Sequence, residues 1–242
     1  MAEMIYEIAL ATGNAGKAQE IADILSRSGG IAGGLRVRTL KEIIGSMPYI
    51  EENGLTLREN ARIKALAARK AMDEFFGAKR KTGPATVEKA KTEEIAASGA
   101  HVIAAADDSG LFVDSLGGRP GVFSARYGGS PGAVPEPSRQ MEMLLDEMKN
   151  IPPEARAARF RCVMAIVYPG GRLSFAEGEC EGFIAMRPKG SGGFGYDPIF
   201  YLSAFDRTMA ELSSDEKNEI SHRGAAVRQM ADDIQSYMAL QT

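Results

Sequence analysis

The chain has 242 residues, and 29 Lys and Arg against 32 Asp and Glu give a formal net charge of −3. With 44% hydrophobic residues it can bury a substantial core, and its acidic balance argues against a general nucleic-acid surface. Two cysteines and two histidines are too few for a structural zinc site or a disulfide scaffold, and no apolar run approaches the ~18 residues that span a bilayer. With Glu3 and Glu7 in place of a basic leader, we expect a cytoplasmic protein that binds neither nucleic acid nor membrane.

Short apolar or alternating runs predict three strands in the first part of the chain, and apolar residues at helical spacing predict two helices. The expected strands are 5–11, 35–39 and 101–106, and the expected helices are 15–28 and 56–76. Thr56 and Glu59 form a T-x-x-E capping box at the start of the second helix. Residues 77–100 are rich in charge and predict a surface insertion, most simply a solvated one without function.

The second part of the chain begins with a loop-rich stretch, residues 111–127, and ends in helices. A hairpin is expected around Pro169-Gly170-Gly171, between strands 158–168 and 172–182. The expected helices are 138–148 and 221–240, with a further capping box at Ser213 and Glu216. Strands that alternate with helices, together with one hairpin, predict an α/β fold with a mixed sheet.

The segment Thr12-Gly13-Asn14-Ala15-Gly16-Lys17 joins an expected strand to an expected helix. Free N–H groups at a helix N-terminus attract anions, and glycine lets the backbone approach them closely. A lysine in the first turn does not favour the helix itself but suits a nearby phosphate. An ordinary strand-to-helix turn explains the segment about as well, because it matches neither common glycine-rich phosphate motif.

Two adjacent carboxylates, Asp107 and Asp108, directly follow the apolar run 102–106. Burying them is costly unless they are paired or bound to a metal ion. Mg²⁺ prefers such oxygen ligands, and one of the pair could instead deprotonate a water molecule. A turn-capping aspartate is the alternative, but two adjacent acids favour a functional site.

A second acidic pair, Glu51 and Glu52, precedes the helix whose face carries Asn60 and Lys64, four residues apart. These acids could bind Mg²⁺. Taken alone they are better explained as residues that favour a helix start, because the N-terminus of any helix attracts negative charge.

A second Gly-rich loop, residues 192–198, holds two aromatic residues and an acid, and an aromatic on such a loop can stack on a base. A tight turn with core aromatics is the alternative. Lys217 and Ser221-His222-Arg223 add donors near a further helix start, and a solvated polar face is the alternative. These segments together supply a phosphate cradle, carboxylates for a metal ion, a stacking aromatic and further cations. This is the combination that binding a nucleoside triphosphate with Mg²⁺ requires.

Six separated motifs, in order along the chain, make it closely resemble the inosine/xanthosine triphosphate pyrophosphatases, the HAM1-like family. The motifs are residues 12–17, residues 52–56 with 60–61 and 64–65, residues 106–111, 116–127 and 193–198, and residues 217–218 with 221–223. Departures from the family pattern at 77–100 and 131–137 touch no motif.

The resemblance implies hydrolysis of ITP, dITP and XTP at the α–β phosphoanhydride bond to the monophosphate and pyrophosphate, which cleanses the nucleotide pool. It implies Mg²⁺ as cofactor and a homodimer. It also implies one domain over residues 1–242, two-lobed, with a long central mixed sheet flanked by helices and an active-site cleft between the lobes.

By position, the resemblance makes Asp108 the general base and a metal ligand, and Glu52 the other metal ligand. The implied phosphate cradle is Thr12, Gly13, Asn14, Ala15, Gly16 and Lys17. The other implied substrate-binding residues are Asn60, Lys64, Ser109, Phe194, Gly195, Tyr196, Asp197, Lys217, His222 and Arg223. Whether Glu51 or Asp107 also binds the metal stays open.

Base choice is expected at the six-position of the purine, a carbonyl in hypoxanthine and xanthine and an amino group in adenine. Arg223 or an N–H of the Phe194 loop is the candidate donor. A pyrophosphatase of other modified nucleotides and a non-hydrolytic nucleotide sensor are the alternatives. The carboxylates Glu52, Asp107 and Asp108 favour an enzyme over the sensor, and over a purely structural protein.

Overall fold

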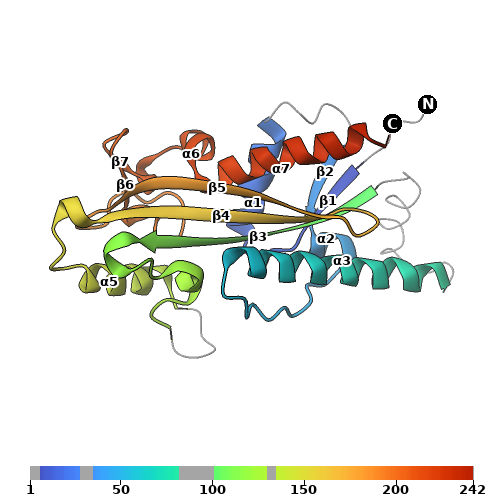
Figure 1. Ribbon diagram of the computed structural model, residues 1–242, viewed down its shortest axis with the longest axis horizontal. Helices are drawn as coiled ribbons and strands as arrows, with labels where there is room; N and C mark the ends of the chain where they lie inside the picture. Colours follow the sequence, from blue (N-terminus) through green and yellow to red (C-terminus); the bar gives the residue numbers. More distant parts are fainter. Residues whose placement is uncertain (1–5, 28–34, 82–100, 130–134, 242) are drawn as a thin grey trace. The chain divides into compact units, whose positions relative to one another are not determined.

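The computed structural model describes residues 6–27, 35–81, 101–129 and 135–241 (Figure 1). Its strands are β1 (Tyr6–Leu10), β2 (Leu35–Thr39), β3 (His101–Val113), β4 (Ala157–Val167), β5 (Leu173–Ile184), β6 (Phe200–Leu202) and β7 (Arg207–Thr208). Its α-helices are α1 (Ala15–Arg27), α2 (Leu40–Ile44), α3 (Leu57–Lys81), α5 (Pro137–Glu147), α6 (Ser214–Ile220) and α7 (His222–Ala239). Among these residues, no helix has both the length and the apolar character needed to cross a bilayer.

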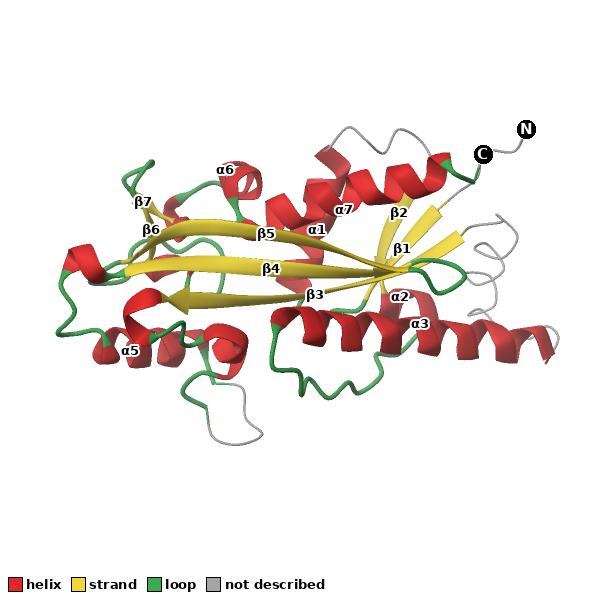
Figure 2. Cartoon of the chain, in the orientation of Figure 1, coloured by secondary structure: helices red, strands yellow, loops and turns green. Residues whose placement is uncertain are grey.

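Seven strands form one sheet in the order β2-β1-β3-β4-β5-β6-β7, and helices flank it (Figure 2). β1 runs parallel to both β2 and β3, whereas β6 runs antiparallel to β5 and β7. Every residue of β1 is buried, as expected of a strand between two parallel neighbours. The predicted α/β fold with a mixed sheet is therefore confirmed.

The chain divides into two compact units, and each is described by itself. The first unit holds residues 1–108, 163–176 and 227–242, and the second holds residues 109–162 and 177–226. The strands β3, β4 and β5 and the helix α7 each contribute residues to both units. The expected cleft between lobes stays a prediction.

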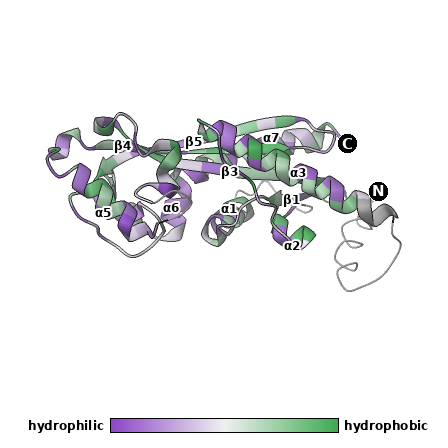
Figure 3. Ribbon diagram, turned by 90° about the horizontal axis from the view of Figure 1, so that it is seen from below, coloured by the Kyte–Doolittle hydropathy of each residue, from purple (hydrophilic) through white to green (hydrophobic). Residues whose placement is uncertain are grey.

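In the first unit, α3 begins and packs as its sequence predicts. Thr56 Oγ1 accepts a hydrogen bond from Glu59 N at 3.1 Å, and Glu59 Oε2 accepts one from Thr56 N at 3.1 Å, which completes the capping box. The buried apolar positions of the helix recur at helical spacing, and three of the five are alanine: Leu57, Ala61, Ala65, Ala68 and Met72. Hydrophobic and hydrophilic bands accordingly alternate along α3 (Figure 3).

The second unit has its own apolar core, to which Leu144 and Met148 contribute. Arg156 lies inside this unit and is only 2% exposed. Its guanidinium donates to the main-chain oxygens of Met148 and Ile184, each at 2.7 Å, so the buried charge is held by hydrogen bonds. Burial lowers the pKa of Arg156.

One predicted boundary is wrong in a way that matters for the site. The strand expected to end at residue 106 continues to Val113, so residues 107–110 lie within β3 rather than after it. The predicted loop-rich stretch starts later, as two short 3-10 helices, η1 (Asp114–Leu116) and η2 (Gly121–Arg126). Two acids, a serine and a glycine normally end a strand, but here salt bridges to Lys17 and Lys64 let the acids stay inside one.

The other predicted helices and strands are confirmed with small shifts at their ends. Sequence periodicity missed α2, β6 and β7, which have 5, 3 and 2 residues. Of α6, which has 7 residues, the sequence predicted only the capping box. Of the expected insertion at 77–100, residues 77–81 continue α3 and the rest lie outside the described residues. Most of the expected extension at 131–137 lies outside them too.

Candidate active site

The first group of predicted site residues gathers where β1 ends beside β3. Leu10 pairs with Ala105, so the loop that begins at Thr12 runs alongside the continuing β3 strand. Asn14 caps α1, because its Oδ1 accepts from Lys17 N at 3.1 Å. Residues 13–16 are exposed at this helix N-terminus, as a phosphate cradle requires.

Asp107 and Asp108 are 3% and 8% exposed within β3. Consecutive strand residues point to opposite faces of a sheet, and the two carboxylates accordingly meet different helices. Asp107 Oδ2 lies 2.7 Å from Lys17 Nζ of α1. Asp108 Oδ1 lies 3.1 Å from Lys64 Nζ of α3. Lys17, at the end of the segment 12–17, thus offsets the charge of Asp107.

Asn60 and Lys64 share one face of α3, as predicted, and both bind Asp108. Asn60 Nδ2 donates to Asp108 Oδ2 at 3.2 Å, while Asn60 Oδ1 accepts from Gly54 N at 2.8 Å. Lys64 Nζ also donates to Glu52 Oε2 at 2.9 Å. Asn60 therefore holds both Asp108 and the loop that carries Glu52.

Burial and charge act in opposite directions on this cluster. Burial raises the pKa of Asp108, although Lys64 and Lys17 oppose the rise. Burial by itself would lower the pKa of Lys64, but Asp108, Asp107 and Glu52 outweigh it, so the pKa of Lys64 is raised. The site thus holds a protonated amine among carboxylates.

The carboxylates fit a hard divalent ion that is shared with a substrate. Glu52 and Asp108 come from separate parts of the chain, and their oxygens already converge on one cation, the Lys64 ammonium. Within the part of the chain that the structure describes, no three His, Cys, Asp or Glu side chains form a metal cage. Mg²⁺ commonly uses one or two carboxylates together with substrate phosphates, so this donor set suits it.

The second group of predicted residues lies in the second unit, around the Phe194 loop. Asp197 is 3% exposed, and its Oδ2 accepts from Phe194 N at 2.9 Å and from Lys217 Nζ at 2.7 Å. The Phe194 ring is half-buried and faces two cations, with Lys217 Nζ at 4.5 Å and Arg223 Cζ at 5.3 Å from its centroid. Such a ring is a platform for a flat, electron-rich ligand.

The start of α7 supplies the remaining donors of this group. Ser213 and Glu216 form the predicted capping box of α6, and α7 follows from His222. Arg223 is 1% exposed, and its Nη2 donates to Ser109 Oγ at 3.3 Å. The His222 ring stacks on Phe160, with centroids 4.8 Å apart and planes 15° apart.

The first turn of α7 rests directly on β5. A Cβ added at Gly178 would lie closer than 3.0 Å to main-chain atoms of His222 and Ala226. We expect Gly178→Val to displace this turn and to lower the free energy of unfolding by about 1–3 kcal/mol. Gly77→Ala in α3, where nothing lies within 4 Å of an added Cβ, is the control and should be neutral or stabilising. Urea denaturation measures both, and a Gly178→Val variant as stable as wild type would contradict this packing.

Two residues of the site were not identified from the sequence. Phe160 lies in the expected strand 158–168, and Ser124 lies in the motif 116–127, to which the resemblance assigns no site residue. Their contacts join residues 62 and 72 positions apart, His222 with Phe160 and Tyr196 with Ser124, which no local spacing reveals. The resemblance implies that both Phe194 and Tyr196 bind substrate; Tyr196 is 4% exposed and belongs to the apolar core of the second unit.

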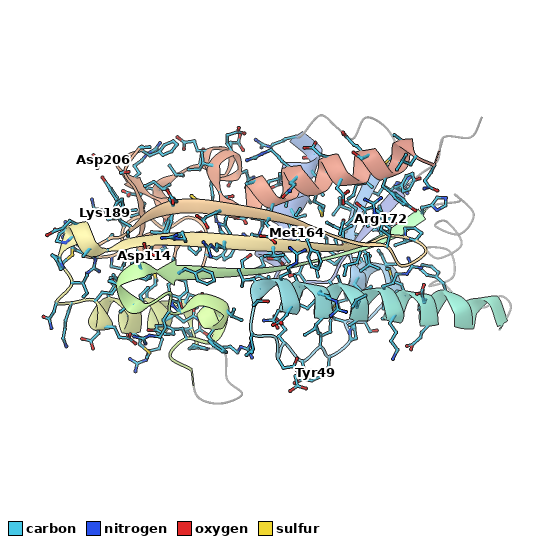
Figure 4. All side chains as sticks on the ribbon, in the orientation of Figure 1. Tyr49, Asp114, Met164, Arg172, Lys189 and Asp206 are labelled. Carbon is cyan, nitrogen blue, oxygen red and sulfur yellow. The ribbon has the colours of Figure 1, made fainter. Side chains whose placement is uncertain are left out.

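The segment between α2 and α3, which carries Glu52, also carries two exposed side chains. Tyr49, on the loop between α2 and α3, is 93% exposed (Figure 4). Leu55, just before α3, is 82% exposed. Neither side chain contributes to the carboxylate and lysine cluster.

Comparison with known proteins gives one consistent family. The sequence profile of the Ham1 family matches residues 8–233. The chain is 42% identical to a dITP/XTP pyrophosphatase of Bacillus subtilis over 94% of this chain and 96% of the relative. It is 40% identical to one of Geobacillus kaustophilus, over 93% and 92%.

Solved structures agree with the sequence comparison. A HAM1 protein from Coxiella burnetii is 34% identical and superposes with a TM-score of 0.73, over 96% of this chain and 100% of that one. The Ham1 protein of Staphylococcus aureus is 32% identical with a TM-score of 0.69, over 98% and 100%. The predicted resemblance is thereby confirmed, and the chain belongs to the Ham1 family.

Proposed function

We propose that this protein hydrolyses ITP, dITP and XTP at the α–β phosphoanhydride bond, giving the nucleoside monophosphate and pyrophosphate. The observation that carries the proposal is the cluster in which Lys64 Nζ bridges Glu52 Oε2 and Asp108 Oδ1 beside the Lys17–Asp107 pair. Such a cluster suits a polyanion that travels with a divalent ion. Membership of the Ham1 family, with relatives named dITP/XTP pyrophosphatase, supports the same activity.

In this proposal the first unit binds the phosphates. The N–H groups at the start of α1 and the amines of Lys17 and Lys64 offset the negative charge of the triphosphate. Glu52 and Asp108 would hold Mg²⁺, which when bound supplies further charge neutralisation. The leaving group is pyrophosphate, whose developing charge the two lysines stabilise.

Asp108 is the proposed general base. Its carboxylate accepts the proton of the water molecule whose oxygen attacks the α-phosphorus, as the bond from that phosphorus to the bridging oxygen breaks. Its burial supports this role, because burial raises the pKa of Asp108 and so makes the carboxylate a stronger base. Asn60 and Lys64 keep the carboxylate in place.

The second unit recognises the base in this proposal. The Phe194 ring stacks on the purine, and Arg223 or a loop N–H donates to the carbonyl at the six-position. Adenine offers an amino group there, so the same donor would be left buried and unpaired, at a cost of about 1–3 kcal/mol. We also propose a homodimer and a cytoplasmic location, which stay predictions.

The proposal is tested by steady-state hydrolysis of ITP, dITP, XTP, GTP and ATP with Mg²⁺. The expected result is turnover of the first three with ATP and GTP nearly untouched, and loss of turnover with EDTA. Equal turnover of all five would contradict the assigned base preference. Nucleotide binding without turnover would favour a sensor.

A further inference from the structure

The motif 116–127, which contains η2, has no role in the proposed function, although it lies beside residues that do. Within η2, Ser124 is 6% exposed, and its Oγ accepts from Leu111 N at 2.8 Å and donates to Gly121 O at 2.6 Å. A Cβ added at Gly110 would lie closer than 3.0 Å to Gly121 O. The 3-10 helix is therefore fixed against β3 immediately after Ser109.

Ser124 also holds the Phe194 loop. The main-chain oxygen of Ser124 accepts a hydrogen bond from Tyr196 Oη at 2.9 Å. Burial raises the pKa of Tyr196, so its hydroxyl stays protonated and able to donate. Tyr196 stands two residues after Phe194, and Asp197 holds the Phe194 N–H from the next position. The loop is thus fixed at two adjacent points.

The hydrogen bonds that join β3 to Ser124, and Ser124 to Tyr196, form a network. Through Ser109 of β3 this network also reaches Arg223, the proposed base donor. Arg223 Nη2 donates to Ser109 Oγ on β3, and Arg223 also lies over the Phe194 ring. β3 therefore positions Arg223 through Ser109, and positions the Phe194 loop through Ser124 and Tyr196. The distance between the Phe194 ring and the Arg223 guanidinium therefore depends on both sets of hydrogen bonds.

We propose that Ser124 and Tyr196 are positioning residues for base recognition, which hold the Phe194 ring in register with Arg223. This inference rests on the proposed function. It assigns Tyr196 a role through the loop rather than by contact with substrate. It predicts an effect confined to ligands that carry a base, because the hydrogen bonds of Ser124 and Tyr196 act on β3, η2 and the Phe194 loop.

The test uses Tyr196→Phe, which keeps the ring and removes the donor, and Ser124→Ala, which removes the Oγ that fixes η2 to β3. Tyr201→Phe is the matched control, since it removes a tyrosine hydroxyl that bonds Asp206 in the same unit but outside the network. For each protein we would measure KM and kcat for ITP and the Kd of IMP and of pyrophosphate.

We expect both variants to raise the KM for ITP and the Kd of IMP by about tenfold, with kcat and the Kd of pyrophosphate at wild-type values. The preference for ITP over ATP should fall as well. Equal weakening of IMP and pyrophosphate binding would indicate a merely structural role and overturn the inference. So would wild-type IMP affinity in both variants of an active enzyme. A wild-type protein that neither binds IMP nor hydrolyses ITP would overturn the proposed function, and this inference with it.

Discussion

Asp108→Asn should lower kcat for ITP by about 10²–10⁴-fold, the range that a positioned general base contributes. The substitution keeps the side-chain shape and one acceptor oxygen, so one of the two donors, Asn60 Nδ2 or Lys64 Nζ, keeps its hydrogen bond. It removes the group that accepts the proton. Nucleotide affinity measured by calorimetry in EDTA should largely survive. Loss of catalysis with retained affinity separates a base from a residue that only binds substrate.

The matched control is Asp73→Asn. Asp73 is an exposed carboxylate on α3 in the same unit, and it pairs with Arg69 on the surface. An exposed pair of this kind contributes little, so the control should hydrolyse ITP at the wild-type rate. Unchanged hydrolysis by Asp108→Asn would rule out Asp108 as the base.

Lys217→Met should lower the free energy of unfolding by about 3–5 kcal/mol, because it removes the cation from a buried carboxylate. Lys217 and Asp197 are 5% and 3% exposed, so water cannot replace the lost partner of Asp197. The variant should also lose affinity for IMP, because Lys217 faces the Phe194 ring. Urea denaturation gives the first quantity and calorimetry the second.

The double variant Asp197→Asn/Lys217→Met distinguishes the buried charge from lost packing. An asparagine at 197 can still accept from Phe194 N, and neither residue of the pair then carries a charge. The double variant should therefore be more stable than Lys217→Met alone. A double variant that is no more stable than Lys217→Met would show that the unpaired charge of Asp197 does not set the cost.

The sequence predicted the elements whose local signals agree with their packing. The capping box at Thr56, the alanine-rich face of α3 and the hairpin turn at Gly170 each depend on residues close together in the chain. The positions of the residues proposed to bind the phosphates and the base could also be predicted, because polar side chains interrupt apolar runs there. Assigning roles to them required the family resemblance.

What the sequence could not reveal depends on distant partners. The extension of β3 past Asp107 and Asp108 needs lysines from α1 and α3, so local rules end the strand too early. Phe194 and Tyr196 stand two residues apart in one Gly-rich loop, and nothing nearby in the chain reveals that the Tyr196 hydroxyl donates to the main-chain oxygen of Ser124. Short elements such as β7, with 2 residues, carry no periodicity to detect.

The most direct test of the central claim is hydrolysis of ITP in ¹⁸O-labelled water, followed by mass spectrometry of the products. Attack on the α-phosphorus predicts inosine monophosphate that carries one ¹⁸O atom and pyrophosphate that carries none. Label in pyrophosphate would mean attack at the β-phosphorus. Release of orthophosphate and a nucleoside diphosphate would contradict the assigned scissile bond altogether.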